Sequence, residues 1–256
     1  MIHATEKHKE IIMEYLYKQP EMNTILIGYV LKFGFDKPFQ DVWIDNETKV
    51  NACFVRYFKI LFMSSYDHIV VHDFVEEIIN KFNIECYAGE TSYLQLYDFK
   101  DLPKKTNMTL AHLTKKLNEP NLPLVKKLGA EHAEMMVDLM HRAFESNIDL
   151  DEVRNDLQSN SARAYGIFDG DKLISMAKSQ AESEKLAMVV YVCSDKNYRG
   201  KGYASMCSDK ISYELQSEGK TPCLYYVDPL AAKIYLKLGY ENIGHYTTVR
   251  RQSRPN

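Results

Sequence analysis

The chain has 256 residues, of which 45% are hydrophobic and 26% are charged. This composition is ordinary for a folded protein and excludes an intrinsically disordered or collagen-like chain. The formal net charge of −3 gives no basic excess, so the sequence does not indicate a dedicated nucleic-acid binder. The length allows one large domain or two small ones.

Cysteine usage and the lack of long apolar segments favour a reducing compartment. The five cysteines are odd in number and show no C-x-x-C pair, which excludes a disulfide framework and a zinc knuckle. Free thiols are typical of the cytosol. No apolar run follows the N-terminus as in a signal peptide, and none approaches the ~20 residues of a membrane helix. We therefore expect a cytoplasmic monomer or homodimer that binds no metal, nucleic acid or membrane.

The first half of the chain predicts helices followed by strands. Apolar spacing indicates helices over residues 5–18, 23–33 and 73–82; Gly34 ends the second and Asp73 caps the third. Runs of β-branched and aromatic residues predict strands at 42–44, 50–57, 60–63, 84–87 and 93–96, the first two joined as a hairpin. Proline and lysine make residues 101–123 a connector, with 108–113 as a candidate short strand.

The second half predicts the same order of elements. Helices are expected at 131–145, 150–157, 200–217 and 229–238, and strands at 165–168, 173–174, 186–193, 224–227 and 246–249. Asp169-Gly170-Asp171 joins the first two strands as a hairpin. Both halves thus run helix, helix, hairpin, strand, helix, strand, although no repeat is evident between their residues.

One segment of the second half carries a chemical signal. A buried strand ending at Ser194 leads through a short turn into Arg199-Gly200-Lys201-Gly202, where an amphipathic helix begins. The first turn of a helix presents unpaired backbone N–H groups and the positive end of its dipole, which suit a phosphate. Glycine lets the backbone approach such a group closely. No P-loop or dinucleotide fingerprint is present, and by itself the segment would favour an exposed basic turn that caps an ordinary helix.

A second motif follows at Asp228-Pro229-Leu230-Ala231 and continues to Tyr235-x-x-x-Gly239-Tyr240. Together the two motifs closely resemble the signatures of the GNAT superfamily of acyl-CoA N-acyltransferases, whose cofactor loop reads Arg/Gln-x-x-Gly-x-Gly/Ala. The resemblance covers about the last half of the chain. It implies an α/β (α+β) fold of two tandem GNAT-like units, each a mixed, mostly antiparallel sheet flanked by helices. Residues 1–119 would form a degenerate unit and residues 120–256 the catalytic one.

The resemblance also implies how the cosubstrate acetyl-CoA is held. Backbone groups at Val192, Cys193 and Ser194 would pair with the pantetheine arm as an added strand does. The pyrophosphate would lie on backbone N–H groups of the loop, which comprises Arg199, Gly200, Lys201, Gly202, Tyr203, Ala204 and Ser205. A strand N–H near Val192 would polarise the thioester carbonyl. The strands near Ser194 and Tyr225 should part to admit the thioester.

The implied reaction is N-acetylation of a primary amine by direct attack on acetyl-CoA. The tyrosine that matches the family's acid is Tyr235, which would protonate the departing CoA thiolate. Its helical spacing from Ala231 and Leu238 also fits simple core packing. The family's asparagine at the start of this helix is Asp228 here; aspartate caps a helix equally well but, when ionised, cannot donate a hydrogen bond to a cofactor.

The remaining candidate residues give weaker functional signals. Glu182 and Glu184 precede the central strand and are candidate bases, although a solvated hairpin tip is the favoured interpretation. Cys193 has no neighbouring base and is expected to be a buried small residue. His68 and His72 have zinc-like spacing without a third ligand. No glycine lies between Ile60 and Asp73, so the N-terminal half should hold no pyrophosphate and should instead shape the acceptor pocket.

Two alternatives to an acetyltransferase remain open from the sequence. One is a protein that binds acyl-CoA without turning it over, and the other is a transferase that uses a different acyl chain. The sequence leaves the amine acceptor open among small amines, amino acids, aminoglycosides and protein termini.

Overall fold

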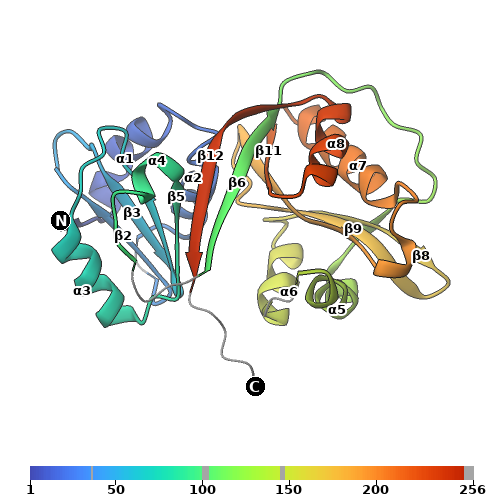
Figure 1. The fold of residues 1–256 in the computed structure, drawn as a ribbon, viewed down its shortest axis with the longest axis horizontal. Helices are drawn as coiled ribbons and strands as arrows, with labels where there is room; N and C mark the ends of the chain where they lie inside the picture. Colours follow the sequence, from blue (N-terminus) through green and yellow to red (C-terminus); the bar gives the residue numbers. More distant parts are fainter. Residues whose placement is uncertain (36, 100–103, 145–147, 251–256) are drawn as a thin grey trace. The chain divides into compact units, whose positions relative to one another are not determined.

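The computed structural model describes residues 1–35, 37–99, 104–144 and 148–250. The chain forms two compact units (Figure 1). Unit 1 comprises Met1–Leu110 and Asn242–Asn256, and unit 2 comprises Ala111–Glu241. The chain passes from one unit to the other within strand β6 (Lys104–Leu113) and returns within strand β12 (Tyr240–Arg250).

Unit 1 is built on a mixed sheet with the strand order β1-β2-β3-β4-β5-β12-β6. Its remaining strands are β1 (Ile2–His3), β2 (Gln40–Ile44), β3 (Cys53–Tyr57), β4 (Ile60–Ser64) and β5 (Cys86–Glu90). Strands β4 and β5 are parallel, whereas β2–β3, β3–β4 and β5–β12 are antiparallel. The helices are η1 (Glu6–His8), α1 (Lys9–Leu16), α2 (Thr24–Phe33), α3 (His72–Phe82) and α4 (Thr91–Leu94).

The helices of unit 1 cover both faces of its sheet. On one face Tyr29 of α2 contacts the rings of Tyr57 and Phe62. On the other face Phe74 of α3 contacts Trp43 and Phe54 at right-angle ring geometry. Because successive strand residues point to opposite faces, a strand that is covered on both sides is buried along almost its whole length, as β3 and β4 are.

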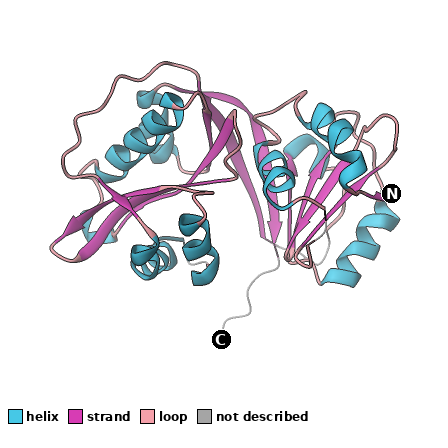
Figure 2. Ribbon diagram, turned by 180° about the vertical axis from the view of Figure 1, so that it is seen from behind, coloured by secondary structure: helices cyan, strands magenta, loops and turns pink. Residues whose placement is uncertain are grey.

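Unit 2 has the strand order β6-β11-β10-β9-β8-β7. Its strands are β7 (Lys126–Leu128), β8 (Ala164–Asp169), β9 (Lys172–Gln180), β10 (Leu186–Ser194) and β11 (Thr221–Tyr226). Its helices are η2 (Ala130–His132), α5 (Ala133–Phe144), α6 (Leu150–Gln158), η3 (Lys196–Tyr198), α7 (Tyr203–Ser217) and α8 (Pro229–Leu238). Helices α7 and α8 cover one face of the sheet, and α5 and α6 cover the other (Figures 1 and 2). Only the β10–β11 pair is recorded as parallel among the paired strands described in this unit.

The two units repeat one another element by element. Each begins with a short strand, a 3₁₀ turn and two helices, and each continues as strand, strand, strand, helix, strand, helix, strand, except that unit 2 has the additional 3₁₀ turn η3 before α7. The repeat extends to individual residues. The Nδ1 atom of His8 accepts a hydrogen bond from the backbone N–H of Thr5 at 2.9 Å, and His132 caps its turn in the same way from Gly129 at 3.1 Å. The same local hydrogen bond thus occurs at the same place in both units.

Several predicted elements need correction. Residues 93–96 do not form a strand, because Tyr93 and Leu94 belong to helix α4 and are buried with Tyr97 on one helical face. Helix α3 begins one residue earlier than predicted: Val71 is its N-cap, and Asp73 lies in its first turn without a capping hydrogen bond. Ten residues of the predicted connector form the strand β6, which is longer than the candidate strand expected at 108–113. The strands β1 and β7 were not expected, and Glu145, the predicted end of α5, lies outside the described residues.

The compact units also differ from the expected boundary between residues 119 and 120. The chain crosses into unit 2 at Leu110, and its last strand returns to unit 1. In unit 1 that strand, β12, pairs with β5, from Tyr246↔Glu90 to Arg250↔Cys86. A strand that comes from the far end of the chain completes this sheet, so no single cut in the sequence separates the units.

Candidate functional site

Strands β10 and β11 of unit 2 run side by side for only part of their length. Their parallel pairs extend from Leu186↔Thr221 to Val189↔Leu224. β10 then continues to Ser194 and β11 to Tyr226, with no further pair between them among the described residues. From Val190 onward β10 is therefore not paired with β11, and this edge could pair with an added strand.

The same stretch of β10 is irregular on its other edge. The register with β9 shifts between Val190 and Cys193, which leaves Tyr191 and Val192 as a β-bulge. Tyr191 has a φ of +52°, a conformation that is rare for a bulky L-residue. Ser175 of β9 holds the far side of the bulge, because its hydroxyl donates to the Cys193 carbonyl oxygen at 2.8 Å. The bulge turns backbone groups away from the regular ladder just where the two strands part.

The loop after β10 exposes a row of backbone donors. Gly200 and Gly202 have φ values of +77° and +80°, and a Cβ atom added to either would meet no atom within 4 Å. Gly202 is the N-cap of α7, and the first helical bond runs from the Met206 N–H to the Gly202 carbonyl. Within the part of the chain that the structure describes, the N–H groups of Arg199 to Ser205 donate to no protein acceptor. A helix N-terminus with this many unpaired N–H groups fits an anion such as a pyrophosphate.

A buried carboxylate anchors this loop. Asp195 accepts hydrogen bonds from Lys172 at 2.8 Å, from the backbone N–H of Asn197 at 3.0 Å, and from Arg142. The Lys172 bond, with the Asn197 and Arg142 bonds, holds the pKa of the Asp195 carboxyl well below its usual range. Its side chain is only 3% exposed. The ionised carboxylate thus ties β9, α5 and the glycine loop together.

A solvent-open hollow of about 150 Å³ lies beside the loop. It is lined by Leu139, Arg142 and Ala143 of α5 and by Ser194, Asp195, Lys196 and Arg199. Three of these side chains are cationic and one is anionic. The hollow is therefore suited to negative groups rather than to a polycation.

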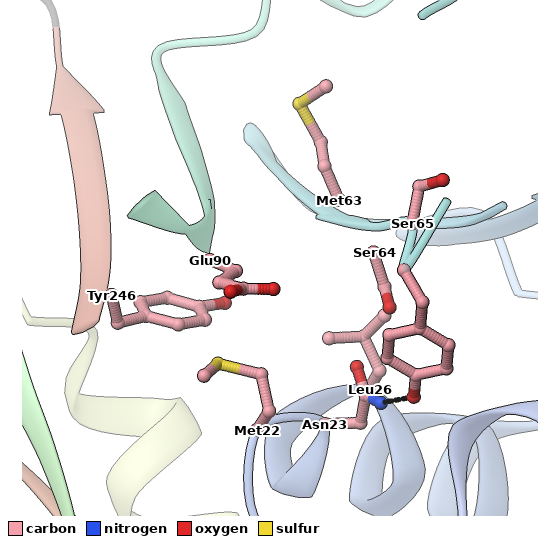
Figure 3. A pocket seen from close by; sticks show the side chains of 9 residues that line it. Met22, Asn23, Leu26, Met63, Ser64, Ser65, Glu90 and Tyr246 are labelled. Atoms are coloured by element: carbon pink, nitrogen blue, oxygen red, sulfur yellow. Dashed lines mark hydrogen bonds between the residues drawn. The ribbon is translucent and has the colours of Figure 1, made fainter. Parts of the chain in front are cut away.

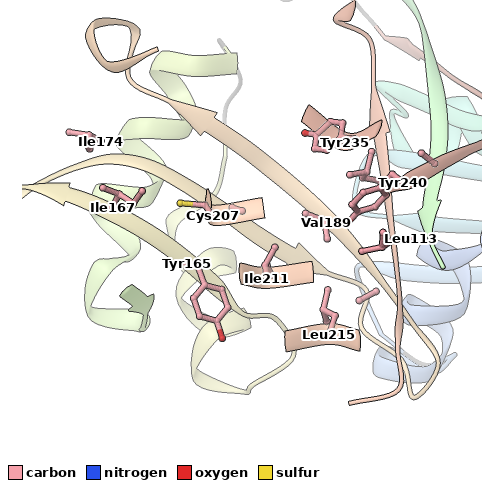
Figure 4. Packing of buried hydrophobic residues seen from close by; sticks show 14 residues of the cluster. Leu113, Tyr165, Ile167, Ile174, Val189, Cys207, Ile211, Leu215, Tyr235 and Tyr240 are labelled. Atoms are coloured by element: carbon pink, nitrogen blue, oxygen red, sulfur yellow. The ribbon is translucent and has the colours of Figure 1, made fainter. Parts of the chain in front are cut away.

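Tyr235 lies in the core between α8, α7 and the sheet (Figure 4). It is 6% exposed, and its ring centre lies 5.8 Å from those of Tyr226 and Tyr240. Burial raises the pKa of its phenol to about 12, so the hydroxyl is protonated at neutral pH. These contacts account for the packing role that the helical spacing predicts, and the protonated hydroxyl retains the ability to donate a proton.

The remaining predicted site residues fall into two groups. Val192 and Ser194 lie at the open end of β10, and burial raises the pKa of the Cys193 thiol to about 12, which makes it a poor nucleophile. Asp228 is the N-cap of α8 and accepts from the Leu230 N–H at 2.8 Å. By contrast, Glu182 and Glu184 precede the opposite end of β10. Glu182 is not a solvated tip: it is bound by Arg163 at 2.7 Å and is 7% exposed.

The sequence did not single out Tyr191, Asp195 or Arg142. The Asp195-x-Asn197 pattern is a recognisable side-chain cap of a turn and could have indicated the anchor. Nothing local marks the bulge at Tyr191, because tyrosine does not favour a positive φ.

Unit 1 lacks this arrangement at the corresponding place. Its parallel pairing ends at Met63↔Gly89, but the β3–β4 register from Cys53 to Tyr57 has no shift, and no glycine follows β4 before α3. A small pocket lies at the ends of β4 and β5 instead (Figure 3). Its lining side chains include Glu90 and Tyr246 on one side and Asn23, which is hydrogen-bonded to Tyr66, on the other.

No described helix is long and apolar enough to cross a membrane. The described residues contain no group of three or more His, Cys, Asp or Glu side chains arranged to hold a metal ion.

Comparison with known proteins agrees with this geometry. A family model described as GNAT acetyltransferase matches residues 19–249. Similar solved structures include a GCN5-related N-acetyltransferase-like protein from Streptococcus suis, with a TM-score of 0.68, 14% identity and coverage of 97% of this chain and 100% of that one. A Drosophila protein gives a TM-score of 0.72 at 11% identity, covering 97% of both chains.

A third similar structure has two units. It is a tandem GNAT protein from the clavulanic acid biosynthesis pathway, with a TM-score of 0.57, 12% identity and coverage of 99% of both chains. At these identities the structures show a shared fold and no more. No curated protein matches the sequence. The family model spans most of the chain, and the chain therefore belongs to the GNAT acetyltransferase family.

Proposed function

We propose that this chain transfers an acetyl group from acetyl-CoA to a primary amine, and that unit 2 carries the reaction. One observation supports this most strongly: the open edge of β10 leads directly into the row of unpaired N–H groups from Arg199 to Ser205. A strand edge followed by a phosphate cradle matches the pantetheine arm and pyrophosphate of CoA. Unit 1 would be a degenerate copy. The five cysteines, all free and buried, support a cytoplasmic location.

The residues of unit 2 would have the following roles in the reaction. Backbone groups from Val192 to Ser194 would pair with the pantetheine amides, and the bulge would direct the Val192 N–H at the thioester carbonyl. The amine nitrogen forms a bond to the carbonyl carbon, and the C–S bond breaks. The N–H of Val192 would stabilise the negative charge that develops on the carbonyl oxygen between these events. The amine loses its proton to solvent.

The departing thiolate takes up a proton, and we assign its donation to Tyr235. The hydroxyl is held neutral by burial, so it is present as an acid at every pH at which the protein would work. A phenol with a pKa near 12 is a weak acid, however, and its contribution should lie near the lower end of the usual range for general acid catalysis, ~10²-fold. Asp228 would serve only as the helix cap.

The cradle can be tested with two matched glycine variants. Gly202 and Gly219 begin and follow α7, with φ values of +80° and +79°, and an added Cβ meets no atom within 4 Å at either. Gly202→Ala and Gly219→Ala should therefore cost similar stability, about 1 kcal/mol or slightly more, from backbone strain. Only Gly202→Ala should weaken acetyl-CoA binding, by ~10-fold or more, in calorimetry. Equal affinities in the two variants would refute the cradle.

Turnover separates the proposed reaction from the alternatives. Release of free CoA thiol in the presence of a panel of amines would support acetyl transfer. Tight acetyl-CoA binding without thiol release for any amine would indicate a binding protein. Faster release from a longer acyl-CoA would indicate a different acyl donor.

A further inference from the structure

The small pocket of unit 1 at the ends of β4 and β5 combines one carboxylate with neutral oxygens and apolar walls (Figure 3). Its volume is about 10 Å³, which gives room for one group the size of a water molecule, and it is open to solvent. Its oxygen-bearing side chains are Asn23, Ser64, Ser65, Tyr66, Glu90 and Tyr246, and its apolar side chains are Met22, Leu26 and Met63. None of these lining residues is cationic, so Glu90 carries the one formal charge among them.

Asn23 presents an amide oxygen to this pocket. The residue is 1% exposed, and its Nδ2 atom donates to the carbonyl oxygens of Leu16 at 3.0 Å and Gln19 at 3.1 Å and to the Tyr66 hydroxyl. Since a carbonyl oxygen only accepts, these bonds fix which end of the amide is the nitrogen. The Oδ1 atom therefore points the other way, and no hydrogen bond to it is recorded among the described residues. A buried amide oxygen that lacks a protein donor is suited to a donor from outside the chain.

The Glu90 carboxylate is oriented without being neutralised. The Ser92 hydroxyl donates to its Oε1 atom at 2.9 Å, and the Nε2 atom of His68 lies 3.2 Å from the Ser92 oxygen. Within the described ranges of the chain, the Ser92 bond is the one interaction recorded for this carboxylate, and no ion pair is recorded for it. The Oε2 atom and the negative charge are thus left for a cationic ligand.

A third acceptor lies opposite Glu90. Ser64 is 7% exposed, and its Oγ atom lies 3.4 Å from the Tyr15 hydroxyl, which uses only part of its hydrogen-bonding capacity. In Figure 3 the Glu90 carboxylate and the Ser64 hydroxyl point into the same space. The oxygens of Glu90, Asn23 and Ser64 match the three N–H donors of a primary ammonium group in number, and its charge complements that of Glu90.

The apolar walls distinguish an alkylammonium group from a metal ion. Met22, Leu26 and Met63 offer no oxygen to a hard cation, which needs six or more oxygen ligands when it is not hydrated. The same three side chains suit the carbon stem of an amine, and methionine adapts its shape readily. Only the ammonium head needs to fit the pocket, because the pocket opens to solvent and the stem can extend outward.

We infer that unit 1 binds a primary alkylammonium compound, with its ammonium head among the oxygens of Asn23, Ser64 and Glu90. The inference goes beyond the proposed acetyl transfer and does not rest on it. No glycine loop follows β4, so the amine is bound here as a ligand and is not acetylated in unit 1.

The test titrates butylammonium chloride into the full chain by calorimetry, in an amine-free buffer without acetyl-CoA. Tetramethylammonium chloride, which has the same charge but no N–H donor, and potassium chloride serve as comparison ligands at equal ionic strength. Butylammonium should bind with a stoichiometry near one, and the other two cations should bind ~10-fold more weakly or less. Glu90→Gln removes the charge but keeps an acceptor for Ser92, and it should weaken butylammonium binding ~10-fold or more.

The matched control is Glu14→Gln, which changes an exposed glutamate of α1 and should leave the affinity as it is. Ser64→Ala removes one of the three acceptors and should weaken binding ~3-fold or more, which provides a second comparison if Glu90→Gln does not fold. Equal butylammonium affinity in the native protein and in the pocket variants would overturn the inference. Binding no tighter than that of tetramethylammonium would do so as well, and the pocket would then hold only water. Both readouts are independent of thiol release, so a failure of acetyl transfer leaves them unaffected.

Discussion

At the scale of single residues, the site depends on backbone groups more than on side chains. In the proposed site Val192 would contribute its N–H through the bulge, and Ser175 bonds to the end of that bulge from the neighbouring strand. Asp195 has the same supporting role for the loop, since its three hydrogen bonds come from three different segments. Tyr235 is the one side chain to which a proton transfer is assigned.

Tyr235→Phe tests that assignment. Phenylalanine keeps the ring contacts with Tyr226 and Tyr240 and removes only a hydroxyl for which no hydrogen bond to another described residue is recorded. The melting temperature and the acetyl-CoA affinity should therefore change little, whereas kcat should fall by ~10²-fold. Steady-state kinetics with the best amine would show this. A variant as fast as the native protein would leave Tyr235 as a packing residue.

The pH dependence of the native enzyme follows from the same group. An acid must be protonated to act, and the raised pKa of about 12 keeps Tyr235 protonated well above neutral pH. The rate should therefore show no decline from this group below about pH 11, and the profile of Tyr235→Phe should run parallel to it. A high-pH decline near pH 9 that disappears in Tyr235→Phe would contradict the pKa direction.

At the scale of elements, helices α7 and α8 differ in how their N-termini are capped. Helix α7 begins at a glycine that leaves its first N–H groups uncovered, whereas α8 begins at Asp228, whose carboxylate covers one of its own. The first arrangement leaves donors for a ligand, and the second uses a donor for stability. The difference explains why only one of the two helix N-termini is assigned to the pyrophosphate.

Asp228 variants test the capping role. Asp228→Ala removes the hydrogen bond to the Leu230 N–H and should lower the free energy of unfolding by about 1 kcal/mol, roughly 2–4 °C in Tm. Asp228→Asn keeps an accepting oxygen and should be nearly as stable as the native protein. Thermal unfolding followed by circular dichroism measures both. If Asp228→Ala melted at the native temperature, the cap would contribute nothing.

At the scale of the whole molecule, the two units share an order of elements but differ at the place of the proposed site. Unit 1 keeps the order of elements and the histidine cap, but its β4 is regular and no glycine follows it. Without a bulge and a close-approach loop, its N–H groups are not arranged to receive a pyrophosphate.

We therefore predict one acetyl-CoA per chain. Calorimetric titration of this chain should give a stoichiometry near one, and Gly202→Ala should lower the affinity of that single site. An isotherm with two sites, one of which is untouched by Gly202→Ala, would show that unit 1 also binds the cosubstrate.

The sequence alone determined the parts of this protein that depend on local signals. Helix α8 begins at Asp228 and ends before Gly239 as the capping rules predict, and the hairpin around Gly170 forms where its turn residues stand. The glycine loop and the two family motifs are also local, which is why the family was recognisable from the second half of the chain. Helix α4 was misassigned because four residues carry too little periodicity to separate a helix from a strand.

The tertiary structure decided everything that requires two distant segments to meet. The pairing of β12 with β5 and the length of β6 come from partners far along the chain, so no local pattern encodes the boundary between the units. The parting of β10 from β11, the bulge at Tyr191 and its contact with Phe144 likewise arise from register and packing. A tyrosine at positive φ contradicts local preference and persists only because the surrounding sheet holds it there.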